Sequence, residues 1–239
     1  MAAWALKRFW AEARAAEVPS GFAVHLDGRP VRTPAKAPLV LPTRALAEAV
    51  AAEWQAQEGE VRPALMPLTR IAHSAVDQVT PQFNAVVDML AAYGGTDLLC
   101  YRAVAPAELV ARQAAGWDPL LAWAADALGA PLRAVPGVMH VAQEGASLGA
   151  LDGRLRAMTA FELSAAHDLV AIPGSLVLAL AVSEGRLTAD AAFTLSRIDE
   201  TWQAELWGPD EEAVESDALK RAAHGHAARF LELCRAQDC

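Results

Sequence analysis

The chain has 239 residues, of which 54% are hydrophobic, and its 20 Lys and Arg against 29 Asp and Glu give a formal net charge of −9. This acidity, without any cluster of basic residues interleaved with aromatic ones, argues against a nucleic-acid partner. The longest apolar run, around residues 176–182, is well short of the roughly 18–20 residues that a membrane span needs, so we expect no membrane contact.

The three cysteines, Cys100, Cys234 and Cys239, are widely spaced and form no Cys-x-x-Cys pair. An odd number at these spacings indicates neither a disulfide framework nor a thiolate zinc site, and it is typical of a reducing compartment. The first ten residues, MAAWALKRFW, have neither the length nor the Ala-x-Ala cleavage site of a secretory signal. We therefore expect a cytoplasmic protein.

The first predicted element is a small β-meander over residues 18–43. Phe22, Val24 and Leu26 occupy alternate positions, which is the period of a half-buried strand. The pair Asp27-Gly28 is typical of a tight hairpin turn. Three short strands of this kind are marginal alone and need a helix to cover one face.

The covering helix is predicted directly after the meander, with Thr43 as its N-cap and Gly59 as its stop. Apolar residues then recur at helical spacing, at Leu46, Ala47, Val50, Ala51 and Trp54. We expect an α+β protein with an N-terminal α/β domain at residues 1–60. A larger, mostly helical domain, an orthogonal bundle, is expected at residues 61–239.

The remainder of the chain has a helical pattern from Pro63 onwards. Residues 96–102 are ambiguous between a strand and a connector, and residues 129–145 are predicted to be irregular or β. Asp118 and Pro119 predict a kink or break in the helical segment that begins at Pro106. Later helices are expected at residues 148–157, 161–170, 175–182, 188–207 and 211–235.

No constellation typical of catalysis is present. The sequence has no phosphate-binding loop, no Gly-x-Gly-x-x-Gly turn and no Gly-x-Ser-x-Gly elbow, and Ser175 is expected to be an N-cap. His73 and Asp77 lie one helical turn apart, but two ligands fall short of a metal site. A small hydrolase or metal enzyme using His73 and Asp77 is the alternative to a binding protein. His224 and His226 are expected to be solvated.

The helix expected over residues 188–207 presents an unusual pattern. Its two apolar stripes consist of Leu195, Ile198, Trp202 and Leu206 on one side, and of Phe193, Ala204 and Trp207 on the other. Glu200 lies in the middle of the second stripe. Because a surface helix needs only one buried face, the second stripe is either packed by neighbouring helices or exposed as a partner surface.

Six stretches of the sequence, taken in order, resemble one protein family. They are LDGRPVRTP, EWQAQ, MPLTRIAHSAVD, YGGTDLLCYR, WDPLLAW and ETWQAELWG. Together they are similar to the assembly chaperones that act on the alpha subunit of the F-type ATP synthase catalytic sector. The resemblance runs from about Lys7 to Gly208, and it includes nothing in residues 131–159 or after Asp210.

This resemblance implies a small N-terminal α/β domain joined to a helical bundle, with no catalysis and no cofactor. Such a protein binds the free alpha subunit and prevents its self-association until it is incorporated with beta. Mitochondrial members carry an import presequence, so its absence here implies a bacterial member in the cytoplasm, with the matrix as the location of eukaryotic relatives. We expect a monomer, and a general protein-binding scaffold is the other binding role considered.

The resemblance also implies that one acidic residue in DETWQAELWG is important for activity. We match this residue to Glu200, with its neighbour Asp199 as the other choice. Glu200 flanked by Phe193 and Trp207 would be an apolar patch with a charge in it, which suits a protein interface. Arg197, three residues earlier, would hold the carboxylate while the site is empty.

Overall fold

The computed structural model describes residues 7–237. The expectations for the first six residues and for Cys239 therefore lie outside the described residues. The chain forms two compact units: the first runs to Phe83 and takes up Thr159–Ala165 and the segment from Arg229, and the second is Asn84–Met158 with Ala166–Ala228. The boundary that the sequence predicts after residue 60 stays a prediction.

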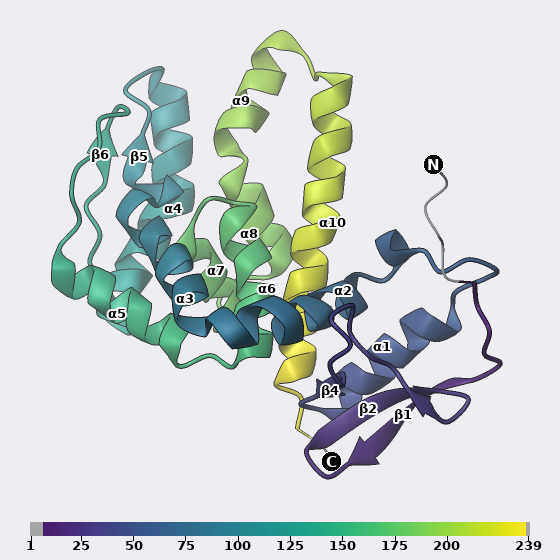
Figure 1. Ribbon diagram of the computed structural model, residues 1–239. Helices are drawn as coiled ribbons and strands as arrows, with labels where there is room; N and C mark the ends of the chain where they lie inside the picture. The colour runs from purple at the N-terminus through teal and green to yellow at the C-terminus, as the bar shows by residue number, and fades with distance from the viewer. Residues whose placement is uncertain (1–6, 238–239) are drawn as a thin grey trace. The chain divides into compact units, whose positions relative to one another are not determined.

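The first unit begins with a four-stranded antiparallel sheet in which β2 is central. The strands are β1 (Ala13–Val18), β2 (Gly21–Leu26), β3 (Arg29–Pro30) and β4 (Val40–Leu41), and β2 pairs with each of the others. Helix α1 (Arg44–Gln55) packs against β1 and β2 (Figure 1). The predicted small antiparallel sheet and its covering helix are therefore confirmed. Strand β1 was not predicted, and β4 pairs with β2 instead of following β3 in a simple meander.

Helix α1 begins and packs as its sequence predicts. Thr43 Oγ1 accepts the N–H of Leu46 at 3.2 Å and donates to the carbonyl of Leu233 at 2.6 Å, so the cap also ties down a later segment of the same unit. Trp54 is buried and meets Trp10 edge to face, with ring centroids 5.4 Å apart. All five of the predicted apolar residues of this helix are buried.

A glutamate of α1 caps the helix that follows it. Glu53 accepts the N–H groups of Leu68 and Thr69, both at 2.8 Å, at the start of α2 (Pro67–Ser74). These N–H groups have no partner within their own helix, and a carboxylate at this end is favoured by the helix dipole. The stretches EWQAQ and MPLTRIAHSAVD therefore act together in the first unit.

The hairpin turn between β2 and β3 is of the two-residue type. Asp27 and Gly28 both have positive φ, 47° and 81°, and Leu26 pairs with Arg29 across the turn. The Asp27 carboxylate also accepts the backbone N–H groups of Ala11 and Glu12, and these hydrogen bonds lower the pKa of Asp27. The predicted Asp-Gly turn is confirmed.

The remaining segment of the first unit is a run of helical turns. After the 3₁₀ turn η1 (Pro63–Leu65) and α2, a π-helical turn η2 (Ala75–Val79) and a 3₁₀ turn η3 (Thr80–Gln82) complete it. The hydroxyl of Ser164 donates to the carbonyl of Ile71 at 3.0 Å, and Arg235 pairs with Glu162 at 2.6 Å. These bonds hold the two later segments in the unit.

The second unit is mostly helical. Its elements are α3 (Phe83–Ala91), η4 (Ala92–Thr96), η5 (Leu98–Cys100), β5 (Tyr101–Arg102), α4 (Ala107–Leu128), β6 (Val135–Pro136), α5 (Gly145–Arg156), the end of α6 (Ala160–Ala171), α7 (Leu176–Ser183), α8 (Ala189–Ser196), α9 (Ile198–Trp207) and most of α10 (Glu211–Cys234). Strands β5 and β6 form a short parallel pair. An α+β fold, with a small sheet followed by a larger helical part, is confirmed.

Helix α7 is the central element of this unit, and a buried carboxylate holds its N-terminus. Asp97 accepts the hydroxyl of Ser175 at 2.7 Å and the N–H of Val177 at 3.0 Å. Burial raises the pKa of Asp97, while these hydrogen bonds act in the opposite direction. Ser175 also accepts the N–H of Leu178 at 3.0 Å, which confirms it as an N-cap.

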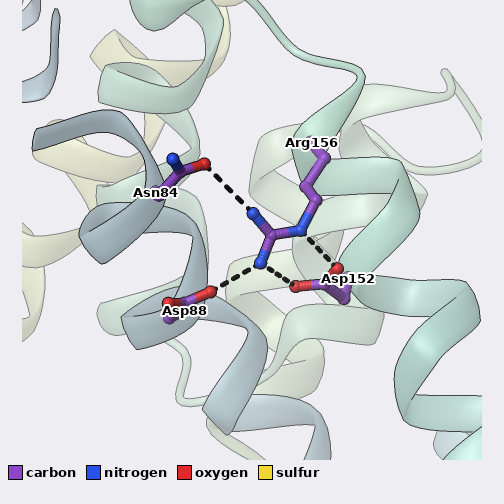
Figure 2. A network of polar contacts seen from close by, with 4 residues as sticks. All are labelled: Asn84, Asp88, Asp152 and Arg156. Carbon is purple, nitrogen blue, oxygen red and sulfur yellow. Dashed lines mark hydrogen bonds and ion pairs between the residues drawn. The ribbon is translucent and has the colours of Figure 1, made fainter.

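An arginine network joins α3 to α5. Figure 2 shows the guanidinium of Arg156 between the two helices, bonded to Asp152 at 2.6 Å, to Asp88 at 2.6 Å and to Asn84 at 3.2 Å. The side chains are partly exposed, so each ion pair contributes modestly to stability. The network fixes the mutual orientation of the two helices rather than forming a ligand site.

A kink or a break was predicted at Pro119; the break is wrong, because α4 is continuous from Ala107 to Leu128, and the kink stays a prediction. The proline removes one intrahelical hydrogen bond, but Trp117 and Leu120 on either side of it are buried, and their packing outweighs that loss. Asp118 is not a cap and instead pairs with Arg102 at 2.8 Å. Among residues 7–237, no helix has both the length and the apolar character that a membrane crossing requires.

We expect Gly28→Val to lower the free energy of unfolding by about 1–3 kcal/mol, because a β-branched residue is strained at positive φ. Nothing lies within 4 Å of the position of a Cβ at Gly28, so backbone strain and not a clash is the cause. Chemical denaturation measures the effect. Gly28→Asn is the matched control, since asparagine tolerates this conformation; a Val variant with the wild-type midpoint would contradict the assignment.

Candidate partner-binding surface

The single helix predicted over residues 188–207 is wrong. Helix α8 ends at Ser196, Arg197 leaves the helical conformation with φ −109° and ψ 20°, and α9 begins at Ile198. The buried hydroxyl of Ser196 donates back to the carbonyl of Phe193 at 2.7 Å, a local bond that competes with helix continuation. The change in direction means that Phe193 and Glu200 do not share one helix face.

Phe193 is a core residue and not part of an exposed patch. Its side chain is 2% exposed, and it packs on His224 of α10 with ring centroids 6.1 Å apart. The guanidinium of Arg221 covers the same ring at 4.8 Å. His224, which was expected to be solvated, is fully buried here, and desolvation lowers its pKa.

Helix α9 is fixed on α4 by close packing. Gly116 of α4 permits the approach, since a Cβ there would lie only 2.9 Å from Cδ1 of Ile198 and 3.0 Å from Cδ2 of Leu195. Further along α9, Arg112 makes two hydrogen bonds to Glu205, both at 2.8 Å, and lies over the ring of Trp202 at 5.0 Å. The face of α9 that carries Ile198, Trp202 and Glu205 is therefore occupied by α4.

Asp199 is also held from α4. The buried Gln113 accepts the N–H of Ala103 through Oε1 at 2.8 Å, and this bond fixes the orientation of its amide. The amide nitrogen then donates to Asp199 Oδ1 at 2.6 Å. Asp199 is half-buried, and the bond from Gln113 gives one of its oxygens a defined structural partner.

The opposite face of α9 is exposed. Glu200, Gln203, Ala204 and Trp207 lie at i, i+3, i+4 and i+7, and all are exposed to solvent. The Glu200 side chain is 46% exposed and Trp207 is 78% exposed. The second apolar stripe was expected either to be packed by neighbouring helices or to be exposed as a partner surface. Its α9 residues, Ala204 and Trp207, are exposed and are not packed by neighbouring helices.

Arg197 holds the Glu200 carboxylate, as its spacing predicts, and also reaches α10. Its Nη1 lies 2.9 Å from Glu200 Oε1, while Nε and Nη2 lie 3.3 Å and 3.2 Å from the two oxygens of Asp217. Neither Asp217 nor Gln113 was expected from the sequence to contact this region. Both lie on other helices, and neither belongs to a local pattern that would identify its partner.

Of the two residues of the alternative metal site, Asp77 has a structural role. Asp77 accepts the hydroxyl of Thr33 at 2.6 Å and the N–H of Ala35 at 3.0 Å. His73 is half-buried, and desolvation lowers its pKa. Within the described part of the chain, no three His, Cys, Asp or Glu side chains gather as a metal site would require.

Comparisons with known proteins agree on one family. A family model described as ATP12 chaperone protein matches residues 7–125. The structure of Atp12 from Paracoccus denitrificans is 53% identical, covers 96% of this chain and 98% of its own, and superposes with a TM-score of 0.94. The chain belongs to the ATP12 chaperone family.

Two further structures of similar proteins extend the comparison. A mutant of Paracoccus denitrificans Atp12 in which an aspartate is replaced by lysine matches with the same identity, coverage and TM-score of 0.94. Atu1473 from Agrobacterium tumefaciens, described as a putative chaperone, is 43% identical, covers 95% of this chain and 85% of its own, and has a TM-score of 0.91. The ATP12 fold therefore includes the α8–α10 region, which lies beyond the segment that the family model matches.

Because Phe193 is buried, we expect Phe193→Ala to lower the free energy of unfolding by about 3–5 kcal/mol through a core cavity. The measurement is chemical denaturation, and any loss of partner binding should be secondary to unfolding. Trp207→Ala is the matched control on the neighbouring helix, since its exposed ring should leave stability nearly unchanged. A Phe193→Ala protein of wild-type stability would refute the core assignment.

Proposed function

We propose that this chaperone of the ATP12 family binds the free alpha subunit of the F-type ATP synthase and keeps it from self-association until beta takes it up. Family membership over nearly the whole chain supports the chaperone role. The identity of the client rests on the resemblance of the six sequence stretches. We place the protein in the bacterial cytoplasm, as a monomer that acts without catalysis or cofactor.

The observation that carries the proposed binding mode is the exposed stripe of α9. Because α4 occupies the other face of this helix, Glu200, Ala204 and Trp207 point away from the core. A large exposed aromatic ring on the same helix face as a carboxylate is typical of an interface with a charge for register. Arg197 stabilises the carboxylate before binding, and Phe193 contributes indirectly, by supporting α8 from within the core.

This mode is compatible with release. A chaperone for a subunit must bind less tightly than the final assembly, so that beta displaces it by competing for overlapping surface. Interfaces of about 1,200–2,000 Å² range from micromolar to picomolar affinity, so the size of the interface alone does not decide how easily beta displaces the chaperone. Such an exchange needs no nucleotide.

Reversal of the Glu200 charge is the direct test. We expect Glu200→Lys to change the free energy of unfolding by no more than about 0.5 kcal/mol, because the residue is exposed. Binding of purified alpha subunit should weaken by about 2–5 kcal/mol, because the lysine would face the partner in a desolvated contact. Thermal melting and a pull-down of alpha measure the two effects.

Glu48→Lys is the matched control, since Glu48 is an exposed glutamate on α1 and its reversal makes the same change in net charge. Normal melting with lost binding in Glu200→Lys alone supports the proposal. Wild-type binding by Glu200→Lys would remove Glu200 from the interface. If the wild-type protein itself does not bind alpha, the proposed client is wrong.

The choice between Glu200 and Asp199 needs variants that remove charge without adding bulk. Asp199→Asn retains an oxygen that can accept from Gln113, so the contact with α4 survives while the charge is lost. We expect Glu200→Gln to weaken alpha binding and Asp199→Asn to bind nearly as well as wild type, in the same calorimetric assay. The reverse result would assign the functional carboxylate to Asp199, which the aspartate-to-lysine mutant of the Paracoccus relative makes worth testing.

A further inference from the structure

The N-terminal half of α10 is a helix with little of its surface buried. Residues 211–222 are exposed except for Ser216 and Asp217, which are half-buried. Two large apolar side chains on it are open to solvent, with Val214 57% exposed and Leu219 70% exposed. A helix gains most of its stability from packing an apolar face, so a half-helix of this kind indicates a surface that is completed by a partner.

One stripe of this half-helix is turned toward α8 and the start of α9. Asp217 pairs with Arg197, Arg221 pairs with Asp190 of α8, and His224 packs on Phe193. Helices α9 and α10 and the loop between them are called the α9–α10 hairpin below, with the loop as its tip. Val214 precedes Asp217 by three residues and extends the same stripe toward this tip. Leu219, two residues after Asp217, lies on the opposite side of the helix.

The exposed stripe of α9 is on the side that faces α10. The guanidinium of Arg197 pairs with both Glu200 and Asp217. The two stripes therefore meet at the base of the α9–α10 hairpin, which is the end away from the connecting loop. Figure 1 shows α9 and α10 as two helices that run side by side and are joined by a short loop. Beyond the base, Ala204, Trp207 and Val214 remain exposed, so the two helices do not bury each other's facing stripes.

The charge of this hairpin is of one sign. From Asp199 to Asp217 the sequence has no Lys or Arg and eight carboxylates, namely Asp199, Glu200, Glu205, Asp210, Glu211, Glu212, Glu215 and Asp217. The four between residues 210 and 215 are all exposed. A partner that neutralises them must be basic, and a partner that covers Trp207 and Val214 must be apolar on one side.

We propose that the facing stripes of α9 and α10 form a docking groove for a basic, amphipathic segment of the client protein. The apolar side of the segment packs on Ala204, Trp207 and Val214, and its Lys or Arg side chains pair with the surrounding carboxylates. At the base of the groove, a cation of the client competes with Arg197 for Glu200 and Asp217. In naming alpha as the client, this inference rests on the proposed function.

The test is a matched pair of substitutions on α10, Val214→Arg on the groove side and Leu219→Arg on the opposite side. Both replace an exposed apolar residue by the same cation, so thermal melting should be near wild type for both. Calorimetry measures binding of purified alpha subunit and, separately, of a model amphipathic peptide of leucine and lysine. We expect Val214→Arg to weaken both interactions by about tenfold or more, and Leu219→Arg to change neither by more than about twofold.

The outcomes separate the groove from the identity of the client. If Glu200→Lys loses alpha binding but Val214→Arg and Leu219→Arg both bind like wild type, the groove is wrong and the proposed function stands. If wild type binds the peptide but not alpha, and Val214→Arg alone loses the peptide, the groove stands and the proposed client is wrong. Equal losses in both variants would show unspecific attraction to an acidic surface and would overturn the groove.

Discussion

The close approach of α9 to α4 at Gly116 is the constraint on which the candidate surface depends. Without a side chain at this position, Ile198 and Leu195 pack directly on the α4 backbone. The bonds from Gln113 to Asp199 and from Arg112 to Glu205 then fix the rotation of α9 about its axis. With that rotation fixed, Glu200 and Trp207 must be on the outside.

Elements other than α9 and the start of α10 keep the protein folded. The cores of the two units are supplied by α1 on the sheet and by the buried helix α7, which Asp97 holds at its N-terminus. The second half of α10 contributes Phe230 and Leu231 to the buried core, whereas the exposed stripe of α9 and residues 211–222 of α10 add little to it. The carboxylates at residues 210–215 are exposed to solvent, which favours the contact of this region with water.

Arg197 belongs both to the packing between helices and to the candidate partner-binding surface. It lies at the junction of α8 and α9, and its guanidinium satisfies two carboxylates that would otherwise repel each other across the base of the hairpin. A partly exposed ion pair of this kind contributes little to stability, so replacing Arg197 by a partner's cation, as proposed, would cost little free energy. The arrangement suits a chaperone, whose contacts must form and be given up.

The sequence by itself determined the elements whose signals are local: the Asp27-Gly28 turn, the Thr43 and Ser175 caps, the apolar face of α1 and the pairing of Arg197 with Glu200. These depend on backbone conformation or on residues within one helical turn, so spacing alone predicts them. Only the tertiary structure decided that α4 continues through Pro119, that the chain turns at Arg197, that Phe193 and His224 are buried together, and that Asp217 shares Arg197. Each of these depends on contacts between helices distant in sequence, and such packing outweighs local propensity without leaving a periodic signal in either segment.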